Sequence, residues 1–307
     1  MDVGIVLSGH NDVLAEARQA EALGFSFVAC GEHVFFNGPT SNAFVVLAAA
    51  AAATERLRLL TSITLLPLYP AALVAKLAAT LDRVSGGRLD LGVGVGGESR
   101  AEFDACGVPV SERGARTDEA LDVLTRLFGG DEVTFDGRFT HLDGVTLDPP
   151  PVQRPRPPIW VGGRKDGAMR RAARYADVWM PYMYTPEQLA LSLDRIGSYA
   201  AELGRPGAVD GAVFLWLGVG RDREQAHEAA VAKLGAVYRQ NTDRMLERYV
   251  PTGDPAAVAA RIDEFGAAGA RRVVCALACP DDERAEAIRL LGEEVLPRLG
   301  VRPAPRS

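Results

Sequence analysis

The chain has 307 residues, of which 48% are hydrophobic and 24% are charged, and its formal net charge is −6. This length allows one large core, since a single α/β barrel needs about 250 residues. The acidic balance and the interspersed charges argue against a nucleic-acid partner, because such proteins present a basic face. No apolar run is long and uncharged enough to cross a membrane, and the first residues, MDVGIVLSG, lack the basic start of a signal peptide. We therefore expect a cytoplasmic protein without a membrane part.

The four cysteines indicate a reducing environment. They are Cys30, Cys106, Cys275 and Cys279, and their spacing fits neither a zinc ribbon nor a redox pair. Three of them lie in apolar runs and are expected to be buried, reduced thiols. The four histidines form no HxH or HExxH pattern, so no metal site is expected.

Eight short apolar runs predict buried strands, and helical patterns separate them. The predicted strands are residues 3–7, 25–30, 57–64, 88–93, 158–162, 177–180, 212–218 and 272–276. Runs that are apolar on both faces suit a parallel sheet covered by helices. Eight such units in one domain, residues 1–307, predict a closed (β/α)8 TIM barrel. An open doubly wound sheet is the alternative, although it usually has fewer strands.

Several residues mark the ends of the predicted helices. Asp12 can cap the first helix and Gly24 can end it. Ser41 or Asn42 can cap the second helix, and Pro186 lies at the start of the sixth.

The regular spacing fails between the fourth and fifth strands, which predicts an insertion at about residues 98–157. It contains a helical pattern at residues 117–128, a hairpin at residues 133–145 with its turn at Asp136-Gly137, and a proline-rich connector, residues 149–158. The connector cannot form a helix and is expected to be extended. Insertions of this size usually serve function or form an interface.

His33 is the sharpest candidate for a catalytic group. It follows the second predicted strand, and barrel enzymes carry their chemistry at the carboxyl ends of the strands. An imidazole in that position can exchange a proton near neutral pH or bond to a cofactor. A structural histidine bonded to a loop carbonyl is the alternative.

Glycines follow two other predicted strands. Gly162-Gly163 opens a helix and precedes Arg164 and Lys165, an arrangement that suits a phosphate group, or only a tight turn. The pattern Gly92-x-Gly94-x-x-Gly97 matches a dinucleotide fingerprint by letter, but it follows the fourth strand and lacks the acid that should come about 20 residues later. These loop glycines, with Gly96, let a flat ligand approach or simply turn the chain.

A phosphate-handling aldolase-type barrel is a further interpretation, which needs a lysine inside the barrel. Lys76 lies in a helical pattern and Lys165 near a helix start, so this interpretation is disfavoured.

Taken together, the motifs resemble the luciferase-like flavin-dependent oxidoreductases, especially the branch that uses the deazaflavin F420. The resemblance extends over VGIVL, AEALGFSFVACGEH, LRLLTSITLLPLYP, DRVSGGRLDLGVGVGG, ERGARTDEALDVL, the FDGRF hairpin, PPIWVGG, ADVWMP and TGDPAAVAARIDEFGAAGARRVV. It therefore covers nearly the whole chain.

The resemblance implies a TIM barrel with a flavin or deazaflavin across its mouth. It implies a non-proline cis peptide at Ser62-Ile63 that backs the cofactor ring, and a glycine pair, Gly162 and Gly163, at the cofactor phosphate. It places His33 near the reactive ring, and Glu98 corresponds to an acid or amide of the loop after the fourth strand.

The function implied is hydride transfer between reduced F420 and a small organic substrate, with His33 and Glu98 placing the accompanying proton. An FMN-dependent monooxygenase and a flavin-binding barrel without catalysis are the alternatives. We also expect a homodimer, because relatives dimerise through barrel helices and the alanine-rich segment Ala43–Ala53 permits close contact between helices.

Overall fold

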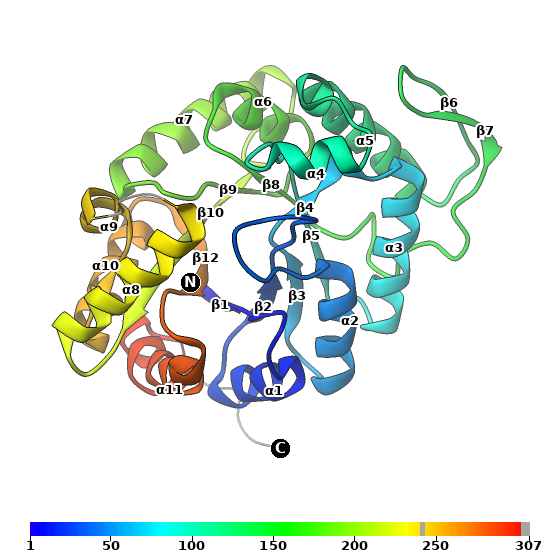
Figure 1. Ribbon diagram of the computed structural model, residues 1–307. Helices are drawn as coiled ribbons and strands as arrows, with labels where there is room; N and C mark the ends of the chain where they lie inside the picture. The colour runs from blue at the N-terminus through cyan, green and yellow to red at the C-terminus, as the bar shows by residue number, and fades with distance from the viewer. Residues whose placement is uncertain (240–242, 302–307) are drawn as a thin grey trace.

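A computed structural model describes residues 1–239 and 243–301. Its central feature is a closed barrel of eight parallel strands (Figure 1). In barrel order these are β1 (Asp2–Val6), β2 (Phe27–Cys30), β3 (Arg58–Thr61), β5 (Leu89–Gly94), β8 (Ile159–Gly162), β9 (Val178–Met180), β10 (Asp210–Val219) and β12 (Ala270–Leu277). β12 pairs with β1, and β10 pairs with both β9 and β12, which closes the ring. The predicted TIM barrel is confirmed, and the open sheet is excluded.

Helices surround the barrel (Figure 1). They are α1 (Val13–Leu23), α2 (Ala43–Ala53), α3 (Ala71–Val84), α5 (Arg113–Phe128), α6 (Asp166–Tyr175), α7 (Pro186–Glu202), α8 (Arg223–Tyr238), α10 (Pro255–Ala267) and α11 (Arg284–Leu290). Asp12 caps α1, and Gly24 ends it with a positive φ of 88°. Asn42 caps α2, whereas the hydroxyl of Ser41 donates to the carbonyl of Gly9 at 2.6 Å. Pro186 is the first residue of α7, as predicted.

The predicted insertion lies between β5 and β8. It comprises α4 (Arg100–Ala105), α5 and the antiparallel hairpin β6 (Val133–Asp136) and β7 (His141–Val145). α5 begins four residues before the predicted helix, because the 3₁₀ turn Val110–Glu112 leads directly into it. The hairpin loop is longer than the Asp136-Gly137 turn, and the amide of Gly137 donates to the carbonyl of Thr140. The carboxylate of Glu119 accepts the amides of Arg138 and Phe139 and so fastens the hairpin to α5.

Short elements complete the chain. They are β4 (Thr64–Leu65), β11 (Thr252–Gly253), α9 (Asp243–Tyr249), the 3₁₀ turns Leu66–Leu68, Asp281–Glu283 and Leu296–Leu299, and the π-helical turn Leu291–Val295. Among the described residues, no helix combines the length and the hydrophobicity that crossing a membrane requires.

The barrel interior is apolar and closely packed. Buried side chains from the strands fill it, including Phe27, Leu60, Trp160 and Val274. A second, larger apolar layer lies between the strands and the helices. The predicted burial of three cysteines is confirmed for Cys30, Cys275 and Cys279, whereas Cys106 is exposed; all four are free thiols.

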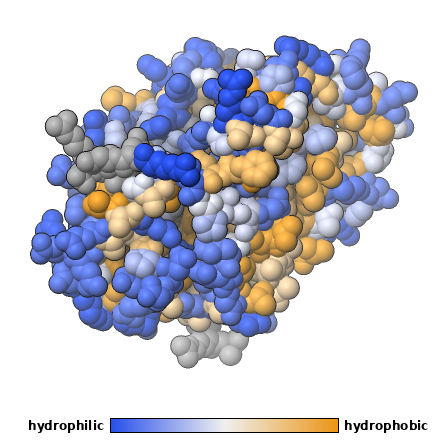
Figure 2. Space-filling view, in the orientation of Figure 1, coloured by the Kyte–Doolittle hydropathy of each residue, from blue (hydrophilic) through white to orange (hydrophobic). Residues whose placement is uncertain are grey.

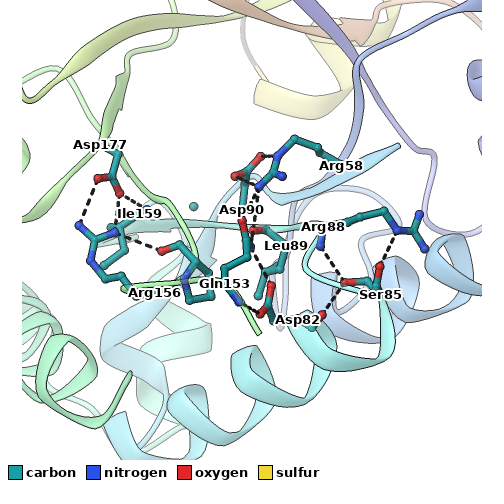
Figure 3. Close-up of polar contacts among 12 residues, drawn as sticks. Arg58, Asp82, Ser85, Arg88, Leu89, Asp90, Gln153, Arg156, Ile159 and Asp177 are labelled. Carbon is teal, nitrogen blue, oxygen red and sulfur yellow. Dashed lines mark hydrogen bonds and ion pairs between the residues drawn. The ribbon is translucent and has the colours of Figure 1, made fainter. Parts of the chain in front are cut away.

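The amino-terminal end of the barrel is closed by a polar network of Arg58, Asp82, Asp90 and Gln153, hereafter the bottom network (Figure 3). Asp82 is fully buried and accepts the amides of Val152 and Gln153 at 2.7 and 3.0 Å. It also accepts the side-chain amide of Gln153, which itself donates to the carbonyl of Leu89. The non-helical connector is thereby tied to α3 and β5, at the end of the barrel opposite the candidate site.

Candidate active site

A bulge separates β3 from β4 at the carboxyl end of the barrel. β3 pairs with β5 as far as Leu60 and Asp90, and pairing resumes between Thr64 and Val93. The first strand uses four residues over this interval and β5 uses three, so one residue is extra. The Ser62–Ile63 peptide in the interval is cis, as the resemblance implied.

Thr61 replaces the missing ladder contacts with its side chain. Its hydroxyl donates to the carbonyl of Gly92 at 2.7 Å and accepts the amide of Gly92 at 2.9 Å. A Cβ atom at Gly92 would lie 1.9 Å from the carbonyl oxygen of Thr61, so this close approach requires glycine. The glycine of this motif therefore serves the bulge.

The side chain of Ile63 packs against two of the predicted site glycines. A Cβ atom would lie 1.9 Å from Ile63 Cδ1 at Gly94 and 3.2 Å from it at Gly162. Gly96 instead faces Leu65 and Phe103. Gly94 and Gly162 thus act by making room for Ile63, which fixes the shape of the barrel mouth.

Two buried hydroxyl groups flank Ile63 without a partner. Ser62 Oγ and Thr64 Oγ1 form no hydrogen bond with the described part of the chain. An unpaired buried hydroxyl costs about 1–3 kcal/mol, so natural proteins usually supply a water or a ligand for such a group. The bulge is therefore suited to a bound polar partner.

Glu32 supports the bulge from the neighbouring strand. This buried carboxylate accepts the amide of Leu65 at 3.0 Å, the hydroxyl of Tyr69 at 3.1 Å and the amide of Ala43 at 3.3 Å. Burial raises the pKa of Glu32, while these hydrogen bonds act in the opposite direction. The contacts connect the residue after the bulge to the first turn of α2.

His33 is held by a carboxylate and not by a loop carbonyl. Its Nδ1 lies 3.1 and 3.2 Å from the two carboxylate oxygens of Glu102, which is fully buried on α4. The amide of Val34 donates to the same carboxylate, and the ring of Phe36 stacks on the imidazole at 4.1 Å. Because Nδ1 donates to Glu102, Nε2 is left for a ligand.

Sequence reasoning missed Glu102. It lies 69 residues from His33, and nothing in the local spacing relates the two. The one signal in the sequence was an acidic residue in the helix that follows the glycine loop. Acidic residues are common in first helical turns, so this signal did not single out Glu102. Glu98, the acid predicted to act with His33, has a different partner: its carboxylate accepts the hydroxyl of Tyr182 at 2.5 Å.

Several aromatic and charged side chains surround Glu98. The guanidinium of Arg164 lies over the ring of Tyr182, 4.5 Å from its centre. Trp216 donates its indole N–H to the hydroxyl of Tyr238 on α8 at 3.1 Å. Burial raises the pKa of Tyr238 to about 12, and the charge of Glu98 raises it further while that of Arg164 lowers it, so Tyr238 lies near both charged groups.

The loop between β8 and α6 offers donors to an anion. Gly163 has a φ of 123°, and a Cβ there would lie 2.9 Å from that of Ala168. No side chain caps the first turn of α6, and in the described part of the chain the guanidinium of Arg164 donates no hydrogen bond. The amides of Ala168 and Met169 donate to the carbonyl of Lys165, so the amides that precede them are the donors that suit a phosphate group beside the cation.

Other parts of the molecule are separate from this site. Lys76 lies on the outer surface of α3 and its ammonium donates to the carbonyl of Asp148, which excludes it as an aldolase lysine. Two surface hollows of about 240 Å³ lie beside Gly220 and Asp254, away from the bulge. In residues 1–239 and 243–301, no cluster of three His, Cys, Asp or Glu side chains could hold a metal ion.

The fold is a TIM barrel whose mouth carries a bulge with two unpaired buried hydroxyl groups. The model of the luciferase-like monooxygenase family matches residues 2–272, and the chain belongs to this family. An uncharacterised protein of Mycobacterium tuberculosis is 37% identical over 182 residues, 59% of this chain. The match spans 62% of the length of that curated relative.

Two solved structures are similar over almost the whole chain. The monooxygenase RslO1 from Streptomyces bottropensis is 27% identical with a TM-score of 0.84, covering 97% of this chain and 100% of that one. An F420-dependent secondary alcohol dehydrogenase, solved with an F420–acetone adduct, is 26% identical with a TM-score of 0.85, covering 98% of this chain and 99% of that one.

Proposed function

We propose that this protein is an F420-dependent oxidoreductase that transfers a hydride between the reduced deazaflavin and a small organic substrate. The observation that carries the proposal is the bulge at Ser62–Ile63, which leaves two buried hydroxyl groups without partners at the barrel mouth. The family membership and the similar F420-dependent dehydrogenase support it. When bound, F420 supplies a hydride and no oxygen chemistry.

The chain's own residues would hold the cofactor at two places. The bulge at Ser62 and Ile63 would support the ring, with Gly94, Gly96 and Gly162 shaping the surface around it. Arg164 and the amides at the start of α6 that precede Ala168 would bind the phosphate of the tail, because they offer donors and a positive charge. The amide of Gly163 donates to the carbonyl of Met180, so Gly163 would serve by letting the ligand approach the backbone closely. This assignment combines the predicted residues with their observed surroundings.

His33 would supply the proton that accompanies the hydride. Reducing a carbonyl, for example, needs a hydride on carbon and a proton on oxygen. Because Nδ1 donates to Glu102, Nε2 of His33 would give that proton from the imidazolium form of the ring and would be left as an acceptor. Glu102 accepts from Nδ1 and so fixes both the tautomer and the ring orientation. The end of β2 adjoins the bulge, since the amide of Ser62 donates to the carbonyl of Cys30 at 2.7 Å. Glu98 would assist at the same mouth through the bond with Tyr182.

An FMN-dependent monooxygenase is the second candidate function. The similar monooxygenase RslO1 favours it, because its identity to this chain is about the same as that of the dehydrogenase. A flavin-binding barrel without catalysis is the third possibility. All three use the same bulge and the same anion site, so binding must be measured before turnover.

Flavin binding tests the proposal directly. Purified protein is titrated separately with F420 and with FMN, and fluorescence quenching gives each Kd. We expect F420 to bind at least about tenfold more tightly, a difference of about 1.4 kcal/mol. Arg164→Ala should weaken binding, whereas Arg221→Ala on the outer surface serves as the matched control. Preference for FMN would support the monooxygenase, and binding of neither would contradict all three functions.

The compartment and assembly are proposed on separate grounds. Three free thiols are buried in the core, which suits the reducing cytoplasm. We propose a small-molecule substrate and a homodimer; the surface for the latter is argued in the Discussion.

A further inference from the structure

Tyr182 contacts two opposite charges at once. Its hydroxyl donates to Glu98 at 2.5 Å, and the guanidinium of Arg164 lies 4.5 Å from the centre of its ring. The three residues come from different parts of the barrel mouth: Glu98 follows β5, Arg164 follows β8, and Tyr182 follows β9. One phenol therefore sets the position of an anion and a cation.

The backbone around Tyr182 is fixed by β10. The amide of Phe214 donates to the carbonyl of Pro181 at 2.9 Å, and Tyr182 forms a bridge with Phe214. Burial, and then the hydrogen bond to Glu98, raise the pKa of Tyr182. The phenol therefore stays protonated at neutral pH and acts as a donor to the carboxylate.

Glu98, in contrast, lies on a glycine-containing loop after β5. It is exposed and follows Gly96 and Gly97, which both have positive φ values of 59° and 104°. Its one hydrogen bond in the described part of the chain is the one from Tyr182. Two cations lie near this loop: Arg164, which lies against the same phenol ring, and Arg113, whose guanidinium lies beside Gly97. Without the bond to Tyr182, Glu98 would be released to pair with Arg164. An Arg–carboxylate pair would then occupy the donors that a phosphate needs.

We propose that Tyr182 is a positioning residue that holds Glu98 away from Arg164 and so keeps the guanidinium open for the phosphate in the tail of a flavin or deazaflavin. This inference rests on the proposed function, since the phosphate belongs to the cofactor. Tyr182 should therefore affect binding of the phosphate-containing tail and not binding of the ring.

Comparing ligands with and without the phosphate separates binding of the tail from binding of the ring. FMN is compared with riboflavin, and F420 with its phosphate-free deazariboflavin core, by fluorescence titration of the wild type, Tyr182→Phe and the double variant Tyr182→Phe/Glu98→Gln. We expect Tyr182→Phe to weaken binding of the phosphorylated ligand about tenfold and to leave its phosphate-free partner unchanged. The double variant should regain wild-type affinity, because a neutral amide does not neutralise Arg164.

Tyr175 provides the matched control. Its hydroxyl is hydrogen-bonded to Asp122 and Arg174 lies over its ring, but it is the last residue of α6, at the other end of that helix from Gly163. Tyr175→Phe should leave every Kd unchanged. Equal losses for both ligands of a pair in Tyr182→Phe, or no recovery in the double variant, would overturn the inference.

Tyrosine titration keeps the inference testable even if no flavin binds. In Glu98→Gln the carboxylate is lost, so the pKa of Tyr182 should fall and one tyrosine should ionise at lower pH, as followed by absorbance at alkaline pH. Identical titration of Glu98→Gln and the wild type would show that Tyr182 does not hold Glu98. Absence of flavin binding by the wild type would instead contradict the proposed function.

Discussion

The pairing of His33 with Glu102 places a buried carboxylate behind a partly exposed imidazole. Glu102 has no exposed surface, while the side chain of His33 keeps 18% of its own. The carboxylate therefore cannot reach a ligand itself, and it acts through the imidazole. Because it also accepts the amide of Val34, it fixes the loop that carries His33 as well as the ring.

Substitution of either member of this pair should lower turnover more than cofactor binding. We expect His33→Ala to reduce kcat by about 10²-fold or more, the usual contribution of a general acid. Glu102→Gln should lower kcat by about tenfold, because one oxygen and an uncharged amide hold Nδ1 less well. The measurements are kcat, KM and the Kd for F420.

The split between kcat and Kd distinguishes positioning from folding. A merely structural role for Glu102 would raise the Kd and lower the melting temperature together, without a specific loss of kcat. Glu112→Gln, at a half-buried acid just before α5 that pairs with Arg138, is a control for charge loss. Full turnover in His33→Ala would contradict the assigned proton transfer.

At the residue scale, the sequence indicated which residues lie at the barrel mouth. It did not indicate which side chains form hydrogen bonds with them. His33 and Gly163 were found because strand ends in a barrel face the same side. Glu102 was not found, since its contact with His33 depends on how α4 packs on the loop after β2. Whether the predicted residues bind a cofactor stays a prediction.

At the scale of elements, the bottom network fixes the position of the irregular connector, residues 149–158, which is hereafter called the strap. Residues 149–158 contain six prolines and cannot pair through regular secondary structure. Asp82 supplies the acceptors instead, from the buried face of α3 (Figure 3). The strap in turn leads into β8, whose carboxyl end carries Gly162 and Gly163.

Asp82→Ala should therefore destabilise the fold without changing the chemistry. Three donors would lose their acceptor, and we expect a loss of about 2–4 kcal/mol in the free energy of unfolding. For a chain of this size that corresponds to a melting temperature lower by roughly 3–6 °C. Thermal unfolding followed by circular dichroism measures it.

Asp82→Asn tests the cause, because it keeps one acceptor oxygen and should lose less stability. The Kd for F420 should be unchanged in both variants at temperatures below unfolding. A fall in F420 affinity with unaltered stability would show that the bottom network supports cofactor binding at the barrel mouth and does not stabilise the strap.

All eight strands were predictable, because buried parallel strands give continuous apolar runs. The cap at Asp12 and the helix start at Pro186 were predictable from their residue types. The start of α5 was not, since a 3₁₀ turn and an α-helix share the same local residues. The bulge between β3 and β4 was suggested only by resemblance. Periodicity cannot show it, because its stability comes from Thr61, Gly92 and Glu32 acting across three strands.

At the scale of the whole molecule, the outer surface of α2 is unusually apolar. Val45 is 70% exposed, and Ala48 and Ala52 lie on the same face of the helix. Leu73 on the neighbouring helix α3 is 48% exposed. Figure 2 shows hydrophobic residues gathered over α2 in the orientation of Figure 1. Small side chains allow two helices to approach closely, so this face suits a second copy of the chain.

We therefore expect a homodimer that forms through α2 and α3. Light scattering after gel filtration should give twice the chain mass of 32.7 kDa for the wild type. Val45→Glu should shift it to the monomer, because a charge would be buried in the contact. Leu191→Glu on α7 is the matched control, since Leu191 is 72% exposed and lies on a different helix. A monomeric wild type, or equal effects of both substitutions, would contradict the assignment of the dimer contact to this surface.

α2 also carries the amide of Ala43 that donates to Glu32, so dissociation should weaken F420 binding only if the dimer stabilises the bulge.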